Sequence, residues 1–426
     1  MKAPHLVIAI ALPAIALPAI AMAAVESASV TAPQHHASVR PVAGGSGRLL
    51  AASRGWQRVG TRARPALRPG RSSTGYRSLP PHARRTRTPS LHSATGHLVR
   101  TPANVDYASG GYGAYNSGAL RRSWVQGVVI NLDWSRVETS PGHFKWTGLD
   151  RTAAAWAHAR KHIALVVRAT NEIRGGCSAG EPQFLPGWEI KALHNALGAI
   201  GTFCDKALRS LIPDWFSSAF RGRFLGFIRA LGKHVSAKPY YQSISYVRIG
   251  VGLAGEGFYL RPHQAGYAAD KAWMVNHWHY TPQRWEGFQK TMLGAYDAAF
   301  PAPVQVIYPI DAQDDLSPHN PVELAVAKWA TNHRGIGIGE ECLPPGGFNR
   351  IFSAILGWVR NHHPHAYMQF QTCGQTNNAA AEHSIIRAAE RYRAKSIEWY
   401  ENTIMRPPSQ SALTAYQSWV NRNFRS

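Results

Sequence analysis

The sequence predicts an α/β fold, a (β/α)₈ TIM barrel, on three observations. From Val125 onward, short apolar segments of strand type alternate with longer segments that carry apolar residues at helical spacing. Such alternation is typical of parallel strands joined by right-handed helical crossovers. Residues 101–426 are long enough for one large barrel. Finally, the β-branched run that starts at Ser245 opens into glycines and a lone carboxylate, Glu256, as buried strands do at the mouth of a barrel.

The first residues, 1–24, are predicted to be a secretory signal peptide. Lys2 precedes an apolar stretch, and small residues follow it. Pro13 and Pro18 interrupt the apolar stretch, which makes a membrane anchor the less favoured alternative. We therefore expect the protein to be secreted, or to reside in the periplasm or cell envelope, without a membrane span.

Residues 25–100 are predicted to be a disordered basic linker. They are rich in Ala, Ser, Gly, Pro and Arg and lack helical or strand periodicity. Thirteen arginines face one acid, Glu26, so about half of the net charge of +23 belongs to this segment. On an exported chain we expect either contact with an anionic cell-envelope polymer or a simply solvated linker, and not nucleic-acid binding.

Residues 101–426 give eight strands if a short, weakly marked one lies near 97–105. Strands two and three lie between Val125 and about residue 172, and strand four precedes Glu256. The later strands are expected at 303–310, 335–341, 366–372 and 396–401, with helices at 323–333, 348–361, 379–394 and 411–424. The long loop from about 171 to 220 is expected to hold a small helical excursion beside the cleft. A doubly wound open sheet is the alternative, disfavoured because no glycine-rich phosphate loop follows the first clear strand.

The segment from Val125 carries a pattern that can be compared with a known family. Its order of Asp-Trp, Val-Glu, Pro-Gly, Phe-x-Trp and Leu-Asp is formed by Asp133, Trp134, Val137, Glu138, Pro141, Gly142, Phe144, Trp146, Leu149 and Asp150. This order resembles the second βαβ unit of retaining glycoside hydrolases with (β/α)₈ barrels, of the β-galactosidase-like families, over about two thirds of the chain. The resemblance implies an exported enzyme that cleaves O-glycosidic bonds of a carbohydrate with two carboxylates. It places the acid/base at the end of strand four, which is Glu256.

The second carboxylate is left open by the sequence. The resemblance implies a nucleophile at the end of strand seven, but that strand ends in Gln371. Glu340 on strand six is favoured, because the sequence around it resembles the Glu, Pro and Gly order near the nucleophile of that family. Glu341 should point to the other side of the strand, outward or toward a loop. Glu341 and Glu398 on strand eight remain alternatives.

Other residues at the strand ends are expected to bind the carbohydrate. Tryptophan rings can stack on sugar rings, and polar groups can bind hydroxyls. The candidates are Asp133, Trp134, Asn171, Gln371, Glu398 and Trp399. The alternative function is a non-catalytic barrel that binds an envelope polysaccharide, which the missing glutamate on strand seven supports.

The four cysteines are expected to form two disulfides, as is usual in exported chains. Cys342 and Cys373 follow the ends of consecutive strands, which are neighbours at one rim of a barrel. Cys177 and Cys204 would close the long loop after strand three. No Cys or His spacing indicates a metal site, and no organic cofactor is expected.

Overall fold

A computed structural model describes residues 96–100, 117–170, 177, 184–205, 210–252, 256–257, 259–260, 266–311, 321–348, 350–374 and 376–424. All of them belong to one compact unit, Ala83–Ser426. The predicted signal peptide, nearly all of the predicted linker, and Asn171 lie outside the described residues.

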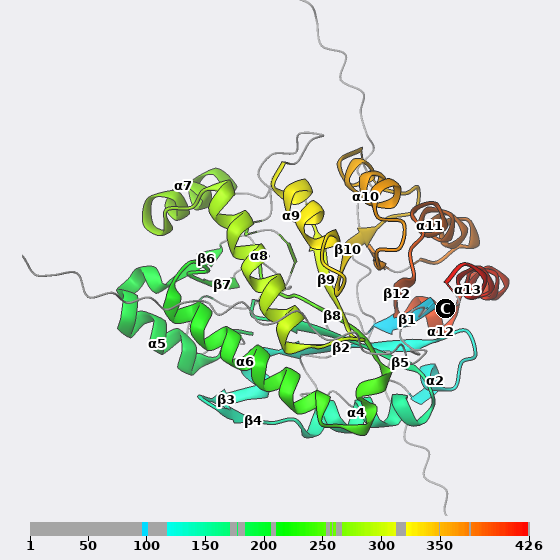
Figure 1. Cartoon of the computed structure of the whole chain (residues 1–426), viewed down its shortest axis with the longest axis horizontal. Helices are drawn as coiled ribbons and strands as arrows, with labels where there is room; N and C mark the ends of the chain where they lie inside the picture. Colours follow the sequence, from blue (N-terminus) through cyan, green and yellow to red (C-terminus); the bar gives the residue numbers. More distant parts are fainter. Residues whose placement is uncertain are drawn as a thin grey trace, which may run out of the picture. The chain divides into compact units, whose positions relative to one another are not determined.

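Eight parallel strands form a closed barrel, which confirms the predicted fold and the strand count (Figure 1). Their order around the barrel follows the chain, and the last strand pairs with the first. The strands are β1 (Gly96–Arg100), β2 (Gly127–Asp133), β5 (His162–Arg168), β8 (Ile244–Arg248), β9 (Gln305–Ile310), β10 (Ile336–Leu343), β11 (Met368–Thr372) and β12 (Ser396–Tyr400). The first strand, β1, spans Gly96–Arg100 and so overlaps the range 97–105 in which a weakly marked strand was expected.

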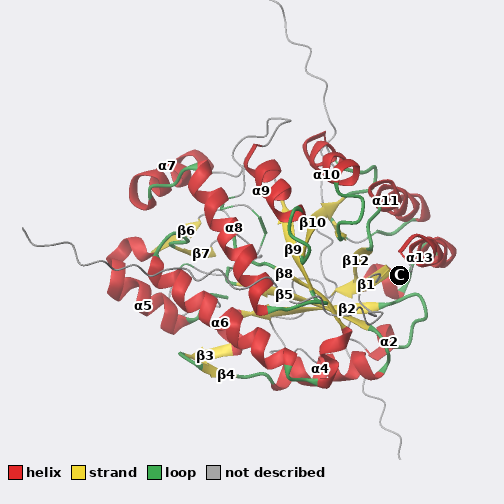
Figure 2. Cartoon of the chain, viewed as in Figure 1, coloured by secondary structure: helices red, strands yellow, loops and turns green. Residues whose placement is uncertain are grey.

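Helices follow the strands and pack outside them (Figure 2). They are α2 (Ser117–Leu120), α3 (Trp134–Val137), α4 (Thr147–His158), α5 (Gly187–Leu197), α6 (Ser218–Ser236), α7 (Tyr267–Trp278), α8 (Pro282–Ala299), α9 (Pro321–Thr331), α10 (Arg350–His362), α11 (Ala379–Tyr392), α12 (Glu401–Met405) and α13 (Gln410–Phe424), with 3₁₀ turns η2 (Gly198–Gly201) and η3 (Pro239–Ser243). Among the described residues, no helix combines the length and the apolar character that crossing a membrane requires.

Side-chain caps set where several of these helices begin. Ser217, Thr281 and Asn378 each precede a helix and accept a hydrogen bond from the backbone N–H three residues later, at 3.0, 3.1 and 2.8 Å. Such caps satisfy backbone donors that have no partner within the helix. They fix the first turns of α6, α8 and α11.

Two short hairpins interrupt the alternation of strands and helices. β3 (Glu138–Ser140) and β4 (His143–Phe144) flank the predicted Pro-Gly turn. After β5, the chain forms α5 and then the hairpin of β6 (Thr202–Asp205) and β7 (Ser210–Pro213). The predicted helical excursion is therefore present, with a hairpin added to it. Both predicted disulfides, Cys177–Cys204 and Cys342–Cys373, are confirmed.

The strands separate an outer core, which faces the helices, from a smaller inner core. The inner core consists of Leu98, Val129, Ala164, Val166, Tyr246, Ile307 and Tyr367. Gly339 of β10 leaves room for it, since a Cβ there would lie 2.6 Å from the side chains of Ile307 and Gln369. Because strand side chains alternate between the two faces, every second residue from these positions also points inward. At the C-terminal strand ends the inward positions are Asp133, Arg168, Arg248, Glu341, Gln371 and Glu398.

Candidate functional site

The inward residues at the C-terminal strand ends form a charged network across the barrel. Arg248 on β8 lies 3.0 Å from Oε1 of Glu341 through its Nε and 3.6 Å from Oε2 of Glu398 through its Nη1. Nη1 also donates to Oε1 of Gln371 at 3.2 Å, and the hydroxyl of Tyr246 donates to Oε1 of Glu398 at 2.6 Å. Because β8 and β12 lie on opposite sides of the closed barrel, these contacts span its interior.

This network joins two carboxylates to one guanidinium, and its carboxylates and guanidinium are buried. Burial and the negative charge of Glu398 raise the pKa of Tyr246 well above its ordinary value, so the hydroxyl stays a hydrogen-bond donor. Buried charges interact strongly because water does not screen them. The network can therefore stabilise positive charge that develops in a ligand above it.

Asp133, a predicted ligand-binding residue, lies in the same mouth with its charge already compensated. Its Oδ1 accepts hydrogen bonds from Nε and Nη2 of Arg168 at 3.0 and 2.7 Å, and its Oδ2 lies 3.4 Å from Nε of Arg136. The Arg168 guanidinium also lies 4.7 Å from the ring centre of Phe184. Two arginines therefore hold Asp133 in place, which limits its freedom to follow a ligand.

Glu256 and Glu340 lie on either side of the C-terminal end of β9. Glu340 pairs with Ile310 in the ladder between β9 and β10, and since it alternates with the inward Glu341, its side chain leaves β10 on the outer face, the face of Ile310. The residue after Glu256, Gly257, packs on the same strand, since a Cβ there would lie 2.3 Å from the carbonyl oxygen of Pro309. The carbonyl of Gly257 accepts hydrogen bonds from two side chains of α8, which fixes this segment.

Glu340 is a buried carboxyl group whose surroundings favour its protonated form. It is 2% exposed, and burial raises its pKa well above the ordinary value. The negative charges of Glu341 and Glu256 raise this pKa further, while the backbone N–H of Cys342, which donates to Oε2 at 2.9 Å, opposes the rise. A buried carboxyl beside other carboxylates can donate a proton at neutral pH.

Trp134 and Trp399 do not reach this mouth, contrary to the expectation from their place at strand ends. Both are fully buried in the outer core. Nε1 of Trp399 donates to Nδ1 of His97 at 2.8 Å, and the ring of Trp134 packs edge-on against Trp188 at 5.7 Å. Ring stacking on a sugar is not open to either residue, since neither side chain is exposed.

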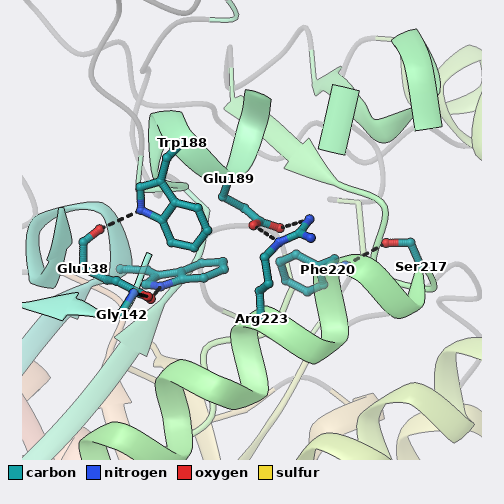
Figure 3. A network of polar contacts seen from close by, with 8 residues as sticks. Glu138, Gly142, Trp188, Glu189, Ser217, Phe220 and Arg223 are labelled. Atoms are coloured by element: carbon teal, nitrogen blue, oxygen red, sulfur yellow. Dashed lines mark hydrogen bonds and ion pairs between the residues drawn. The ribbon is translucent and has the colours of Figure 1, made fainter. Parts of the chain in front are cut away.

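The Val-Glu and Pro-Gly part of the sequence pattern has a structural role that Figure 3 shows. Oε1 of Glu138 accepts from the backbone N–H of Gly142 at 2.7 Å. Its Oε2 accepts from Nε1 of Trp134 at 2.6 Å. The carbonyl of Glu138 accepts from Nε1 of Trp188 at 3.0 Å. Glu138 thereby ties the β3–β4 hairpin to α3 and α5.

The sequence analysis placed one component of the mouth wrongly and missed two. Glu341, kept as an alternative second carboxylate, points inward, where an outward position was expected, and Arg248 and Tyr246 were not considered as site residues. Alternation along β8 could have placed Tyr246 and Arg248 on one face of that strand. Among the described residues, no group of three or more His, Cys, Asp or Glu is arranged to hold a metal ion.

Comparisons with known proteins identify no family for this chain. No protein-family model matches the sequence, and no curated protein matches it. Among solved structures, the chain is similar to the β-galactosidase from the psychrophilic Marinomonas ef1, with a TM-score of 0.45 and 12% sequence identity. The match covers 77% of this chain, and the chain spans 59% of the length of that protein.

Proposed function

We propose that the protein is a glycoside hydrolase whose catalytic carboxyl groups are Glu256 and Glu340. The observation that carries the proposal is the burial of Glu340 at the end of β9, which raises its pKa, with the charges of Glu341 and Glu256 adding to the rise. Active sites of such barrels lie at the C-terminal ends of the strands. Glycosidic hydrolysis needs this combination of a proton donor and a second carboxyl group.

The raised pKa of Glu340 suggests roles opposite to those that the family resemblance implied. A protonated Glu340 would donate its proton to the leaving oxygen. Glu256, which is only half-buried, would serve as the nucleophile or as the base for water. Because the two groups interact, they are expected to titrate as a coupled pair.

The network of Arg248, Glu341 and Glu398 supports this chemistry electrostatically. The transition state of glycoside cleavage carries positive charge on the sugar ring. Two carboxylates that share one guanidinium favour such charge in a site that excludes water. Gln371 and Asp133 would contact hydroxyl groups of the sugar.

The test compares the parent protein with Glu340→Gln and Glu256→Gln on a panel of aryl glycosides. Each substitution should lower cleavage by about 10²-fold or more, because each removes a proton donor or a nucleophile. On an aryl glycoside whose leaving group needs little protonation, Glu340→Gln should stay active and become faster with azide. Glu256→Gln should stay inactive on the same substrate. The configuration of the first product, read by NMR, then shows whether the enzyme retains or inverts.

The control is Glu286→Gln, which removes a partly exposed carboxylate on α8 that pairs with Lys290. Its activity should equal that of the parent. If Glu256→Gln is the variant that azide accelerates, the roles return to those implied by the resemblance. If neither Glu256→Gln nor Glu340→Gln changes cleavage, the pair is not the catalytic one.

A second candidate function, a non-catalytic barrel that binds a polysaccharide, is favoured by one observation. Near the end of strand seven the chain has Gln371 in place of a glutamate, and its side chain accepts a hydrogen bond from Arg248. If this second function is correct, the parent should bind a polysaccharide without cleaving any glycoside, and Glu340→Gln should bind it equally well. In either case we propose that the protein is exported, which its two disulfides support, and that the Arg-rich segment contacts an anionic polymer of the envelope.

A further inference from the structure

A disulfide lies directly beside the proposed acid. Cys342 follows Glu340 by two residues, and its backbone N–H donates to Oε2 of Glu340 at 2.9 Å. Its sulfur is bonded to Cys373, just past the end of β11. Both cysteines are exposed, so the bond is open to solvent at the rim of the barrel.

The backbone between Glu340 and the end of β10 departs from regular pairing. Glu340 pairs with Phe370, but the next pair joins Leu343 to Thr372, so β10 holds one residue more than β11 over this stretch. This is a β-bulge, which changes the direction of the side chains next to it. Cys342 is part of the bulge, and the disulfide links the bulge covalently to the neighbouring strand.

We propose that Cys342 and Cys373 are positioning residues for Glu340. Their disulfide holds the bulge in the shape in which the amide of Cys342 binds the Glu340 carboxyl. The effect of this disulfide on catalysis rests on the proposed function, whereas its effect on the position of Glu340 can be measured without a substrate.

The proposal implies that reductants control the site. A dithiol would transfer two electrons and two protons to the disulfide, which would become two thiols while the dithiol became a disulfide. The freed bulge would then release the hydrogen bond to Glu340. Because that bond favours the ionised form, its loss should raise the pKa of Glu340 further. Glu341 and Glu256, the other charged groups that act on Glu340, raise its pKa with the disulfide intact.

The second disulfide of the chain provides a matched control. Cys177 and Cys204 are 27 residues apart, and Cys342 and Cys373 are 31 apart. Loops of similar length constrain the unfolded chain to a similar degree, so removal of either bond should lower stability similarly. Only the bond between Cys342 and Cys373 adjoins Glu340.

The experiment is a pH titration of ¹³C-labelled glutamate side chains by NMR. It compares the parent, Cys342→Ser/Cys373→Ser and Cys177→Ser/Cys204→Ser, and the Glu340 signal is assigned by its loss in Glu340→Gln. We expect the pKa of Glu340 to rise by about one unit in the first variant, as for the loss of one hydrogen bond to a carboxylate, and to stay unchanged in the second. An unchanged pKa in the first variant, or an equal rise in both, overturns the proposal.

A second measurement covers the case in which the first variant does not fold. Cys177→Ser/Cys204→Ser keeps only the bond beside Glu340, so dithiothreitol acts on that bond alone. The pKa of Glu340 should rise on reduction and return on reoxidation; no change on reduction overturns the proposal.

Activity separates this proposal from the proposed function. If glycosides are cleaved, reduction should lower kcat and leave KM nearly unchanged. If the pKa of Glu340 shifts but no glycoside is cleaved, the positioning stands and the hydrolase function fails. If cleavage depends on Glu340 and its pKa does not respond to the disulfide, the function stands and the positioning fails.

Discussion

The buried ion pair between α5 and α6 should make stability depend on pH through one residue, Glu189. Its side chain is fully buried and contacts Arg223, with Nη2 at 3.1 Å from Oε1 (Figure 3). Burial raises the pKa of Glu189 from its ordinary value of 4.5 to about 7. Arg223 opposes the rise, and the charge of Glu138 adds to it. Replacement by Gln keeps the shape of the side chain and removes the titration.

The sign and the size of the effect follow from this shift. Below pH 4.5, the folded and the unfolded chains both hold the proton, so the shifted pKa has no effect on stability. Between pH 4.5 and 7, the folded chain keeps the proton that the unfolded chain has released, so the parent loses stability as the pH rises. A rise of the pKa from 4.5 to about 7, at about 1.4 kcal/mol for each pH unit, amounts to about 3.5 kcal/mol. Glu189→Gln should therefore gain about 3.5 kcal/mol relative to the parent between pH 4.5 and pH 8.

Urea unfolding followed by tryptophan fluorescence measures this difference at several pH values. The free energy of unfolding of Glu189→Gln minus that of the parent should increase steadily up to about pH 7 and then level off. Glu286→Gln, on the surface of α8, should give a difference that changes by less than about 0.5 kcal/mol over the same range. A pH-independent difference for Glu189→Gln, or one that decreases with pH, would refute the reasoning.

Three further predictions concern the barrel itself. Trp399→Phe should lower the free energy of unfolding by about 2 kcal/mol, because it leaves Nδ1 of His97 without its partner and a gap in the core. KM for a glycoside should stay unchanged, and a raised KM would show that Trp399 contacts the substrate. Gly250→Ala should abolish soluble expression or lower the melting temperature steeply, because the new Cβ would lie 1.2 Å from the carbonyl oxygen of Val167; a parent-like melting curve contradicts this. Removal of either disulfide should cost about 3.5 kcal/mol in urea unfolding, given loops of 27 and 31 residues, and a loss confined to one of them would contradict the loop-entropy account.

The fold could be predicted because its signals are local. Apolar runs of strand length alternate along the chain with segments of helical spacing, and a closed barrel is one of the folds that this order forms. Even the weakly marked first strand could be placed, since a closed barrel of this kind needs eight strands and seven are clear in the sequence. Its start at Gly96 lies one residue before the range 97–105 in which the strand is expected.

The candidate site could be predicted only where chain position alone decides it. Glu256 follows β8 and Glu340 is part of β10, and their action as a catalytic pair stays a prediction. The inward position of Glu341 depends on side-chain alternation and on a bulge that no sequence signal marks. The burial of Trp399 depends on the pairing of β12 with β1, which brings its ring to His97, 302 residues away in the chain.

The pairing of β1 with β12 affects how the chain can be made. Gly96 pairs with Ser396, so the two strands that close the barrel emerge from the ribosome at nearly opposite ends of synthesis of the domain. Until β12 arrives, β1 and β11 are open sheet edges with unpaired backbone groups, which are prone to associate with other chains. The carbonyl of Leu413 on α13, 2.9 Å from Nε2 of His97, adds a contact to β1 that forms later still. A premature stop codon after α11 would therefore yield an open sheet and an aggregating product, and a nascent chain of this length needs protection until its final strand is translated.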